Sequence, residues 1–351
     1  MTPSEISSYT ISERCDVLSA LRILNTFGSD RAQTLFVVDD NNCMTGTVTD
    51  GDIRRHLVEG LELNSPVGTV ANRHFLWLRA CAVDVAEINV ARAKDIELIP
   101  VLDNDGHIIN AVNLKTTRSF LPVDAVIMAG GKGERLMPLT ATTPKPLLPL
   151  GGKAIIDHII DSLIDYGIDN INVTVNYLRE QLISHFSDPV RGIDIHCVEE
   201  PRFLGTIGSL RYVTNLKHDT VLLTNSDAIT NLNYENFFLH FTEHEADMSV
   251  AAIPYSFSVP YGIFELDGRN IRGVLEKPTY NYYANAGIYL IKRDLLSLIP
   301  EGEFFNATDF IERLINQSKR VIRYPLTGYW LDIGVPDEYA RAKEYINHIN
   351  N

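Results

Sequence analysis

Three glycines and two cations stand close together in the middle of the chain. Gly130, Gly131 and Gly133 follow an apolar, β-branched run, and Arg135 and Lys145 come after them. A buried strand that leads into a glycine-rich loop lets backbone N–H groups approach an anion closely, because no Cβ stands in the way. Arginine and lysine supply the positive charge that such an anion needs. The pattern therefore predicts a phosphate-handling loop, and it matches neither the Walker pattern nor the dinucleotide fingerprint.

The stretch from Gly130 to Leu147 reads G-G-K-G-E-R-L-M-P-L-T-A-T-T-P-K-P-L. It resembles the signature of the sugar-1-phosphate nucleotidyltransferases, also called nucleotide-sugar pyrophosphorylases. A tight strand-to-helix turn would need the glycines alone, without Arg135, Lys145 and the two prolines that flank the lysine. The resemblance implies a reaction in which a sugar 1-phosphate joins the α-phosphate of a nucleoside triphosphate and pyrophosphate leaves.

The resemblance also implies roles for residues of the loop. Phosphoryl-type transfer needs in-line alignment and neutralisation of the charge that builds on the phosphates. We expect Arg135 to bind the triphosphate or the departing pyrophosphate, and Lys145 to lie near the transfer centre. The backbone of the loop is expected to bind the nucleotide through Ala129, Gly130, Gly131 and Gly133.

Two aspartates outside the loop are candidates for a magnesium site. Asp227 follows the apolar run V-L-L-T-N-S at the carboxyl end of a predicted strand, and Asp332 lies in Y-W-L-D-I-G-V-P. Mg²⁺ prefers hard oxygen ligands and would hold the phosphates of the substrates. The second motif resembles the late W-x-D-I-G-T-P of the family, which implies that the two aspartates hold the metal together.

Three further motifs resemble the substrate pockets of the family. Residues 204–210 read L-G-T-I-G-S-L, a run whose backbone contacts the base in the family. Residues 276–278 read E-K-P and residues 285–289 read N-A-G-I-Y, which are similar to motifs that bind the sugar phosphate. The resemblance implies nucleotide contacts for Gly205, Thr206 and Gly208, and sugar-phosphate contacts for Glu199, Glu276, Lys277, Asn285 and Gly287.

The first third of the chain contains an internal repeat. Leu35–Asp39 reads L-F-V-V-D and Leu98–Asp103 reads L-I-P-V-L-D, and each run is followed by a polar turn and a second β-rich run. Aligning Asp39 with Asp103 gives an offset of 103 − 39 = 64 residues. A unit of strand, turn, strand and helix is therefore expected twice, as two half-domains that bury one shared face.

The repeat resembles a tandem pair of CBS domains. The first copy carries the G-x-x-T-x-x-D pattern of that family as Gly46, Thr49 and Asp52. The resemblance implies that Thr49 and Asp52 contact an adenine nucleotide, whereas Asn113 and Thr116 replace them in the second copy. We expect at most one competent nucleotide site. A structural or oligomerisation module without a ligand is the alternative reading of the pair.

From Val123 onward, short β-rich runs alternate with amphipathic stretches. This alternation predicts an α/β fold, a Rossmann-like, doubly wound and mostly parallel sheet with ligands at the carboxyl ends of its strands. We expect residues 1–120 to form a smaller α+β CBS pair with a regulatory role and residues 121–351 to form the nucleotidyltransferase domain. The strands are predicted at 171–176, 193–198, 221–226, 248–253 and 286–291, and the amphipathic stretches at 155–166, 178–186 and 204–216.

Composition excludes several classes of protein. The 351 residues hold 31 lysines and arginines against 45 aspartates and glutamates, a net charge of −14, so nucleic acid is not an expected partner. No apolar segment approaches the ~20 residues of a membrane span, and the N-terminus does not read as a secretory signal. The four cysteines, Cys15, Cys43, Cys81 and Cys197, have no metal-binding or redox spacing. We expect a cytoplasmic protein without a membrane partner.

Three competing functions deserve weight. His240 and His244 form an H-x-x-E-H spacing typical of some zinc peptidases, but no third ligand is obvious and a helix that packs on the sheet explains the pattern. A non-catalytic nucleotide sensor is opposed by the intact set of charged residues. A transferase that acts on a phosphorylated alcohol or choline phosphate is opposed by Glu276 and Asn285, which suit a hydroxyl-rich sugar.

Fusion of a CBS pair to this transferase resembles the glucosamine-1-phosphate guanylyltransferases of legionaminic acid biosynthesis. The resemblance favours GTP and glucosamine 1-phosphate as substrates and Mg²⁺ as cofactor. A mannose- or heptose-1-phosphate guanylyltransferase and an enzyme that uses UTP or dTTP stay open as alternatives. CBS pairs commonly associate, so a homo-oligomer is expected.

Overall fold

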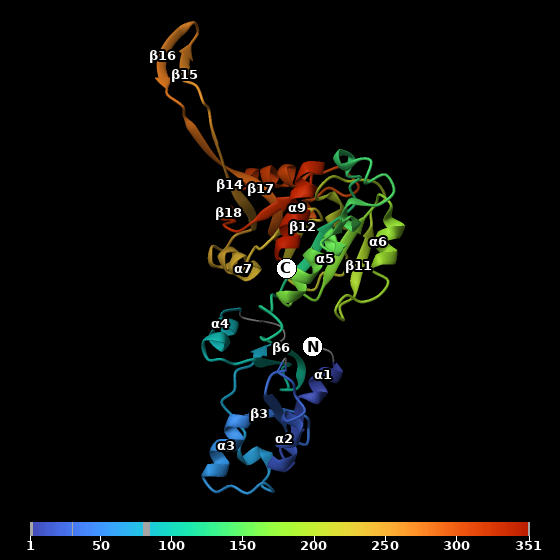
Figure 1. Ribbon diagram of the computed structural model, residues 1–351, viewed down its shortest axis with the longest axis vertical. Coiled ribbons are helices and arrows are strands. Elements are labelled where there is room, and N and C mark those ends of the chain that lie inside the picture. Colours follow the sequence, from blue (N-terminus) through green and yellow to red (C-terminus); the bar gives the residue numbers. More distant parts are fainter. Residues whose placement is uncertain (1–2, 30, 80–84, 350–351) are drawn as a thin grey trace. The chain divides into compact units, whose positions relative to one another are not determined.

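The computed structural model describes residues 3–29, 31–79 and 85–349, and Cys81 lies outside them (Figure 1). The chain divides into two compact units. One unit comprises Met1–Pro122 and Ser162–Asp169, and the other comprises Val123–Asp161 and Asn170–Asn351. No helix in the described part of the chain is long and apolar enough to cross a bilayer.

The N-terminal unit contains two three-stranded sheets built on the same plan. In each sheet the first pair of strands is parallel and the second pair is antiparallel. Thr34 lies opposite Thr49 in the first sheet and Leu98 lies opposite Asn113 in the second, so both partners are shifted by 64 residues, which confirms the repeat. The strands are β1 (Thr10–Ser12), β2 (Thr34–Val38) and β3 (Met44–Thr49), then β4 (Leu78–Arg79), β5 (Leu98–Leu102) and β6 (Ile108–Asn113).

The helix expected after the last strand of each copy forms in the first copy only. Helix α3 (Asp50–Val58) follows β3 because the side chain of Thr49 accepts from the N–H of Asp52 and the Asp52 carboxylate accepts in return, which is a capping box. In the second copy the Asn113 side chain accepts from the N–H of Lys115, so the chain turns instead of starting a helix. The prediction of a helix there was wrong. Each copy has a helix before its second strand, α2 (Val17–Leu24) and α4 (Val85–Ala93).

The second unit is built on a seven-stranded sheet, and the predicted mostly parallel α/β fold is confirmed. Among the seven described strands, β17 alone runs opposite to the others. The chain adds strands to one side of β7 and then crosses to its other side, which makes the carboxyl end of β7 the switch point where ligands bind. In spatial order the strands are β11 (Ile195–Glu199), β10 (Ile171–Val175), β7 (Asp124–Met128), β12 (Thr220–Asn225), β17 (Thr279–Lys292), β14 (Met248–Ser258) and β18 (Val321–Pro325).

Helices cover this sheet and bury its apolar side chains. Phe310 and Leu314 of helix α8 (Ala307–Asn316) pack into one core with Val126 and Leu223 of the central strands. The amphipathic stretch predicted at 204–216 forms only a short 3₁₀ helix, Gly208–Tyr212, since Gly205 has a left-handed φ of +83°. The other helices are α5 (Ile155–Asp165), α6 (Arg179–His185), α7 (Tyr234–Glu243) and α9 (Pro336–Ile349).

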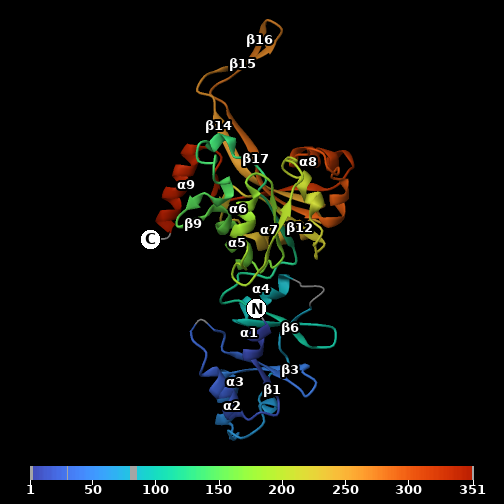
Figure 2. The same ribbon diagram turned by 90° about the vertical axis from the view of Figure 1, so that its right-hand side faces the viewer.

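A long two-stranded arm leaves this sheet. Strands β14 and β17 stay paired from Ala252 and Asn285 out to Ser258 and Thr279. The chain between them forms a further hairpin of β15 (Ile263–Asp267) and β16 (Asn270–Leu275). Both ribbon views show the hairpin standing away from the body of its own unit (Figures 1 and 2).

Candidate active site

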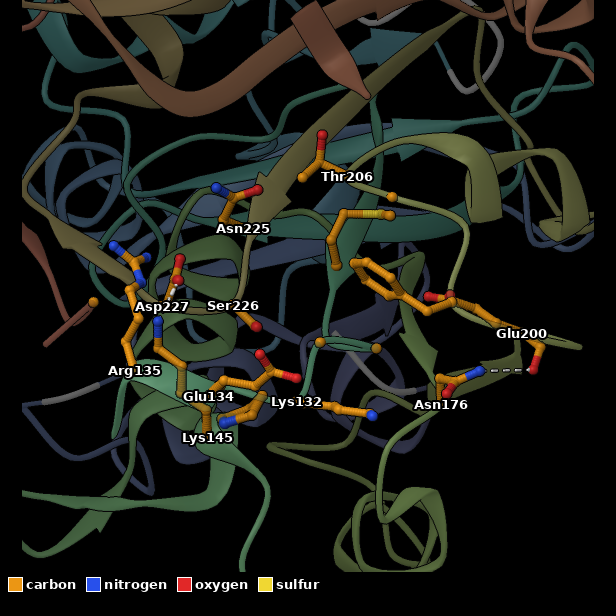
Figure 3. A pocket seen from close by; sticks show the side chains of 18 residues that line it. Lys132, Glu134, Arg135, Lys145, Asn176, Glu200, Thr206, Asn225, Ser226 and Asp227 are labelled. Atoms are coloured by element: carbon orange, nitrogen blue, oxygen red, sulfur yellow. Dashed lines mark hydrogen bonds and ion pairs between the residues drawn. The ribbon is translucent and has the colours of Figure 1, made fainter. Parts of the chain in front are cut away.

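The carboxyl ends of the parallel strands converge on a pocket of about 620 Å³ (Figure 3). The glycine-rich loop follows β7, Asn176 follows β10, Glu200 follows β11, and Asp227 follows β12. This is the edge of the sheet that the strand order marks as the binding edge. The lining residues are Met128, Gly130, Gly131, Lys132, Gly133, Glu134, Arg135, Lys145, Pro146, Asn176, Glu200, Phe203, Gly205, Thr206, Asn225, Ser226, Asp227 and Gly334.

The three positions of the loop are glycine for different structural reasons. A Cβ on Gly130 would collide with Oε1 of Glu200, and Gly133 has a φ of +63° and packs against Lys145. A Cβ on Gly131 would meet nothing within 4 Å, so this part of the loop is open toward the pocket. Gly131 is therefore the glycine of the loop that leaves backbone free for an anion, while Gly130 and Gly133 make room for neighbouring side chains.

Gly205 offers a test of this reading of the glycines. Its φ is +83° and a Cβ would stand 2.6 Å from the carbonyl oxygen of Phe305, so Gly205→Ala is expected to lower the free energy of unfolding by about 2–4 kcal/mol. Gly131→Ala, the matched control, should change it by less than about 1 kcal/mol because its Cβ meets open space. Urea unfolding of the two variants measures the difference, and equal stabilities would contradict the packing described.

Lys145 is a buried cation, only 8% exposed. Its Nζ lies 2.5 Å from Oδ2 of Asp227, and Figure 3 shows Arg135 beside the same carboxylate. Pro144 and Pro146 hold the backbone of the lysine in a short 3₁₀ turn that starts at Lys145. Lys145 and Arg135 therefore place two cations beside the Asp227 carboxylate at this end of the pocket, in a chain of net negative charge.

Asp227 and Asp332, 105 residues apart in the sequence, are brought together by a small sheet. Strand β13 (Ala228–Thr230) pairs with β19 (Trp330–Asp332), which sets Ala228 opposite Asp332. The N–H of Ile333 also donates to the carbonyl oxygen of Asp227 at 2.9 Å. The two aspartates that the sequence singled out therefore lie next to each other on paired backbone segments.

The electrostatics of this pair fit a divalent cation. Burial and the charge of Asp227 raise the pKa of the Asp332 carboxyl, and the charges of Lys145 and Arg135 only partly oppose that rise. Two neighbouring carboxylates whose repulsion the cations offset only in part form the hard-oxygen donor set that such cations prefer. Asp227 and Asp332 are the residues that would hold the ion.

A second cavity of about 330 Å³ adjoins the pocket, and Arg135, Thr206, Asn225 and Asp227 line both. Strand β17 supplies one wall, where Asn285 donates to the hydroxyl of Tyr289 at 2.8 Å and accepts from the N–H of Gly287 at 2.9 Å. Its other lining residues are Ala228, Ala286, Asn306, Ala307, Thr308, Trp330 and Asp332. Two cavities that meet at Arg135 and Asp227 can hold two ligands with their reacting atoms between them.

The structure brings together eleven of the sixteen residues that the sequence singled out for the transferase site, and it leaves five elsewhere. Eleven line the two cavities: Gly130, Gly131, Gly133, Arg135, Lys145, Gly205, Thr206, Asp227, Asn285, Gly287 and Asp332. Ala129 and Gly208 line neither, and a Cβ on Gly208 would stand 2.9 Å from the carbonyl oxygen of Glu303. Glu199 pairs with Arg179 at 3.0 Å, and Glu276 and Lys277 are exposed on the arm.

Glu200, which the sequence reasoning passed over, is the glutamate that lines the pocket. It is 2% exposed, burial raises the pKa of its carboxyl, and its Oε2 accepts from the N–H of Leu204 at 3.4 Å. Successive side chains at a strand end point to opposite sides, so only one of Glu199 and Glu200 can face the pocket. Asn176, Asn225 and Ser226 were missed too, although each is a polar residue at the carboxyl end of a predicted strand.

Thr49 and Asp52 of the first repeat copy form hydrogen bonds with each other. The Thr49 hydroxyl donates to Asp52 Oδ2 at 2.7 Å, and the N–H of Thr49 donates to the same oxygen at 2.9 Å. Arg55 forms an ion pair with the other carboxylate oxygen of Asp52. The two side chains therefore cap helix α3, and their contact with an adenine nucleotide stays a prediction.

The two histidines of the peptidase-like spacing stack on each other. Their rings lie 4.2 Å apart on helix α7 and its C-cap, and Nδ1 of His244 lies 3.0 Å from the carbonyl oxygen of His240. The one group of three or more potential metal ligands in the described part of the chain is Asp103, Asp105 and His107 in the N-terminal unit. The His240 ring also lies edge-on to Tyr324 of β18, with ring centroids 5.2 Å apart, so the helix packs against the sheet as the helix-packing interpretation predicts.

Comparison with known proteins gives two family matches. A model described as "Nucleotidyl transferase" matches residues 124–348, and one described as "CBS domain" matches residues 1–59. The chain is 32% identical over 232 residues to the "Bifunctional protein GlmU" of Methanocaldococcus jannaschii, and 28% identical over 229 residues to a mannose-1-phosphate guanylyltransferase of Mycobacterium tuberculosis. These stretches cover 64% and 63% of this chain, but only 54% and 63% of the two relatives.

The fold is also that of a solved structure. HddC from Yersinia pseudotuberculosis superposes with a TM-score of 0.51 at 23% identity, covering 64% of this chain and 99% of that one. At this identity the likeness concerns the fold alone. The family match covers nearly all of the second unit, including the loop and both aspartates. The chain therefore belongs to the nucleotidyl transferase family.

Proposed function

We propose that this chain works in the cytoplasm as a sugar-1-phosphate nucleotidyltransferase. It transfers a nucleotidyl group from a nucleoside triphosphate to a sugar 1-phosphate and releases pyrophosphate. The observation that carries the proposal is the meeting of two adjoining cavities at Arg135, Asp227 and, from one side each, Lys145 and Asp332. One cavity suits the triphosphate beside the glycine-rich loop, and the other suits a hydroxyl-rich ligand beside Asn285.

In the proposed reaction, an oxygen of the sugar phosphate attacks the α-phosphorus. The bond from that phosphorus to the bridging oxygen of pyrophosphate breaks, and pyrophosphate leaves with the electron pair. Arg135 and Lys145 neutralise the charge that builds on the oxygens, and Asp227 holds Lys145 in place. We propose Mg²⁺ as the cofactor, held by Asp227 and Asp332. When bound, it would neutralise charge on the phosphates and align them.

We further propose GTP and glucosamine 1-phosphate as the substrates. Guanine is favoured by the relative named mannose-1-phosphate guanylyltransferase, and by the sequence resemblance to guanylyltransferases of the legionaminic acid type. Amide and hydroxyl groups of Asn285, Asn306 and Thr308 line the second cavity and suit the hydroxyl and amino groups of a hexosamine. A mannose- or heptose-1-phosphate guanylyltransferase and an enzyme that uses UTP or dTTP remain the alternatives.

A competition experiment tests these substrates. Equal concentrations of GTP, UTP, dTTP, CTP and ATP are mixed with glucosamine 1-phosphate and Mg²⁺, and the nucleotide sugars formed are separated by mass. GDP-glucosamine is expected to dominate the products. Dominance of another base would overturn the guanine assignment within the same class of reaction, and faster turnover of mannose 1-phosphate in a parallel reaction would overturn the sugar.

The first CBS copy is proposed as the one adenine-nucleotide site of the N-terminal unit. Thr49 and Asp52 stand at the start of helix α3, where backbone N–H groups favour phosphate. The second copy has Asn113 and Thr116 at the matching positions and turns away without a helix. Binding at this site would make the activity of the transferase depend on the concentration of adenine nucleotides.

A further inference from the structure

The arm, defined as residues 255–283, is the most apolar exposed segment that the structure describes. Ten of its large apolar side chains are at least 43% exposed, with Tyr261 at 73% and Leu266 at 64%. An isolated two-stranded ribbon is only marginally stable in water, and an exposed apolar surface of this size marks an interface. The arm therefore needs a partner to cover it.

The charges of the arm favour contact with another arm. It carries three acidic residues (Glu265, Asp267 and Glu276) and three basic ones (Arg269, Arg272 and Lys277), so its net charge is zero. The whole chain carries −14, which means that all of this excess lies outside the arm. Two copies that associate through their arms bring together surfaces without net charge, whereas the rest of the chain carries the full net charge of −14 and repels its copy on average.

The exposed area also fits a dimer of this chain. Ten half-exposed large side chains offer on the order of 800–1,000 Å² per arm, and a standard protein interface buries about 800 Å² per partner. A symmetric dimer uses the same patch on both copies. One arm packed on the arm of a second copy would therefore be enough for a stable interface.

Lys277 lies on the arm, out of reach of its own cavity. It stands eight residues before Asn285, and residues of a strand advance about 3.3 Å each, so roughly 26 Å of chain separates it from the cavity wall. Its side chain is exposed and has no hydrogen bond or ion pair within the described residues. Its φ of +43° is unusual for a lysine, and such backbone strain concentrates at functional positions.

We propose that the arms of two copies pair about a two-fold axis and that Lys277 of each copy completes the sugar-phosphate cavity of the other. Asn285 and Gly287, at the root of the arm, line that cavity. When two arms lie antiparallel across a two-fold axis, the distal part of each lies against the proximal part of its partner. The ammonium of Lys277 then reaches the anionic ligand of the partner's cavity. This inference rests on the proposed function, which places a sugar phosphate there.

Heterodimers of two inactive variants test the exchange. Lys277→Ala lacks the arm cation and Asp332→Asn lacks a metal ligand, so each homodimer is expected to lose at least 100-fold in the rate of pyrophosphate release. Co-expression with two different tags and tandem purification gives the heterodimer. Its Lys277→Ala protomer keeps an intact metal site and receives the intact arm, so about half of the wild-type rate per dimer is expected. A heterodimer as inactive as its parents would show that Lys277 acts within its own chain.

Sedimentation of the full chain tests the interface without reference to activity. The wild-type protein is expected to sediment as a dimer or a multiple of one, and the double variant Phe264→Asp, Leu266→Asp is expected to lose this association. Ile183→Asp, at an exposed position outside the arm, is the matched control and should associate like the wild type. A monomeric wild type, or an arm variant that still associates fully, would overturn the arm interface. An associated wild type that forms no nucleotide sugar would overturn the proposed function and the role of Lys277, while the interface would stand.

Discussion

Replacing Arg135 with alanine is expected to lower the rate of pyrophosphate release by two to three orders of magnitude. The guanidinium lies where the two cavities meet, beside the Asp227 carboxylate. One preorganised electrostatic donor of this kind contributes about 10²–10³ in rate, because it stabilises charge that develops only in the transition state. The loss should therefore fall mainly on kcat, with a smaller change in the KM for the triphosphate.

Lys132→Ala is the matched control for Arg135→Ala. Lys132 is a cation of the same glycine-rich loop and lines the same pocket, but it is not among the residues that line both cavities. Its removal should cost less than about 10-fold, the effect of one charge near bound phosphates in contact with water. Steady-state kinetics of both variants, with circular dichroism to verify folding, measure the difference. Equal losses would mean that the loop contributes general positive charge without a defined role for Arg135.

Asp332→Asn is expected to abolish metal-dependent turnover and, at the same time, to stabilise the protein without metal. Burial and the charge of Asp227 raise the pKa of Asp332 above its ordinary value, so the charged carboxylate destabilises the fold at neutral pH. Asparagine removes this cost, and a gain on the order of 1 kcal/mol in the free energy of unfolding is expected at pH 7. Turnover should fall by at least ~10² because one of the two proposed ligands of the cation is lost.

The pH dependence of this difference follows from the direction of the shift. A raised folded-state pKa means that the folded protein binds the proton more tightly than the unfolded chain does. The charged Asp332 therefore lowers the free energy of unfolding of the wild type most strongly above the raised pKa. This loss disappears as the pH falls through the raised pKa toward the ordinary pKa of an aspartate. Unfolding of wild type and Asp332→Asn across this range measures it. A variant that is less stable than the wild type at pH 7 in the presence of a chelator would contradict the account.

Magnesium should reverse the order of stability. An ion that binds only the folded state stabilises it by about 2.7 kcal/mol at 100 times its dissociation constant. The wild type should gain this stability when Mg²⁺ is added, and Asp332→Asn should gain little. Glu134→Gln, which changes a carboxylate of the same pocket, is the control and should respond to Mg²⁺ like the wild type.

The sequence predicted the parts of the site that local motifs define. Gly131, Arg135 and Lys145 belong to one continuous run of sequence. They reach the pocket because this run directly follows the carboxyl end of a sheet strand. The repeat was equally local, since the same offset of 64 residues reappears in the strand pairing of both copies. Asp332 was found through its motif, although its approach to Asp227 depends on the small sheet of β13 and β19.

Positions that depend on tertiary packing could not be predicted in this way. Glu199 and Glu200 are neighbours at the end of a strand, so their side chains point to opposite sides and only one faces the pocket. A shift of the strand by one residue would exchange the two. Lys277 belongs to a motif that reads as local, yet β14 and β17 carry it onto an exposed arm. The helix expected after β6 does not form, because Asn113 turns the chain there. Thr49, at the matching position of the first copy, caps a helix.

The most direct test of the central claim is pyrophosphate release by the wild-type chain, measured with every combination of GTP, glucosamine 1-phosphate and Mg²⁺. Transfer to a sugar 1-phosphate predicts rapid release only when all three are present, together with one GDP-sugar formed for each pyrophosphate. Release that needs GTP and Mg²⁺ but not the sugar phosphate would contradict the account, because it would identify hydrolysis in place of transfer. The same contradiction would follow if neither this sugar phosphate nor any other, with any of the five nucleotides, produced pyrophosphate.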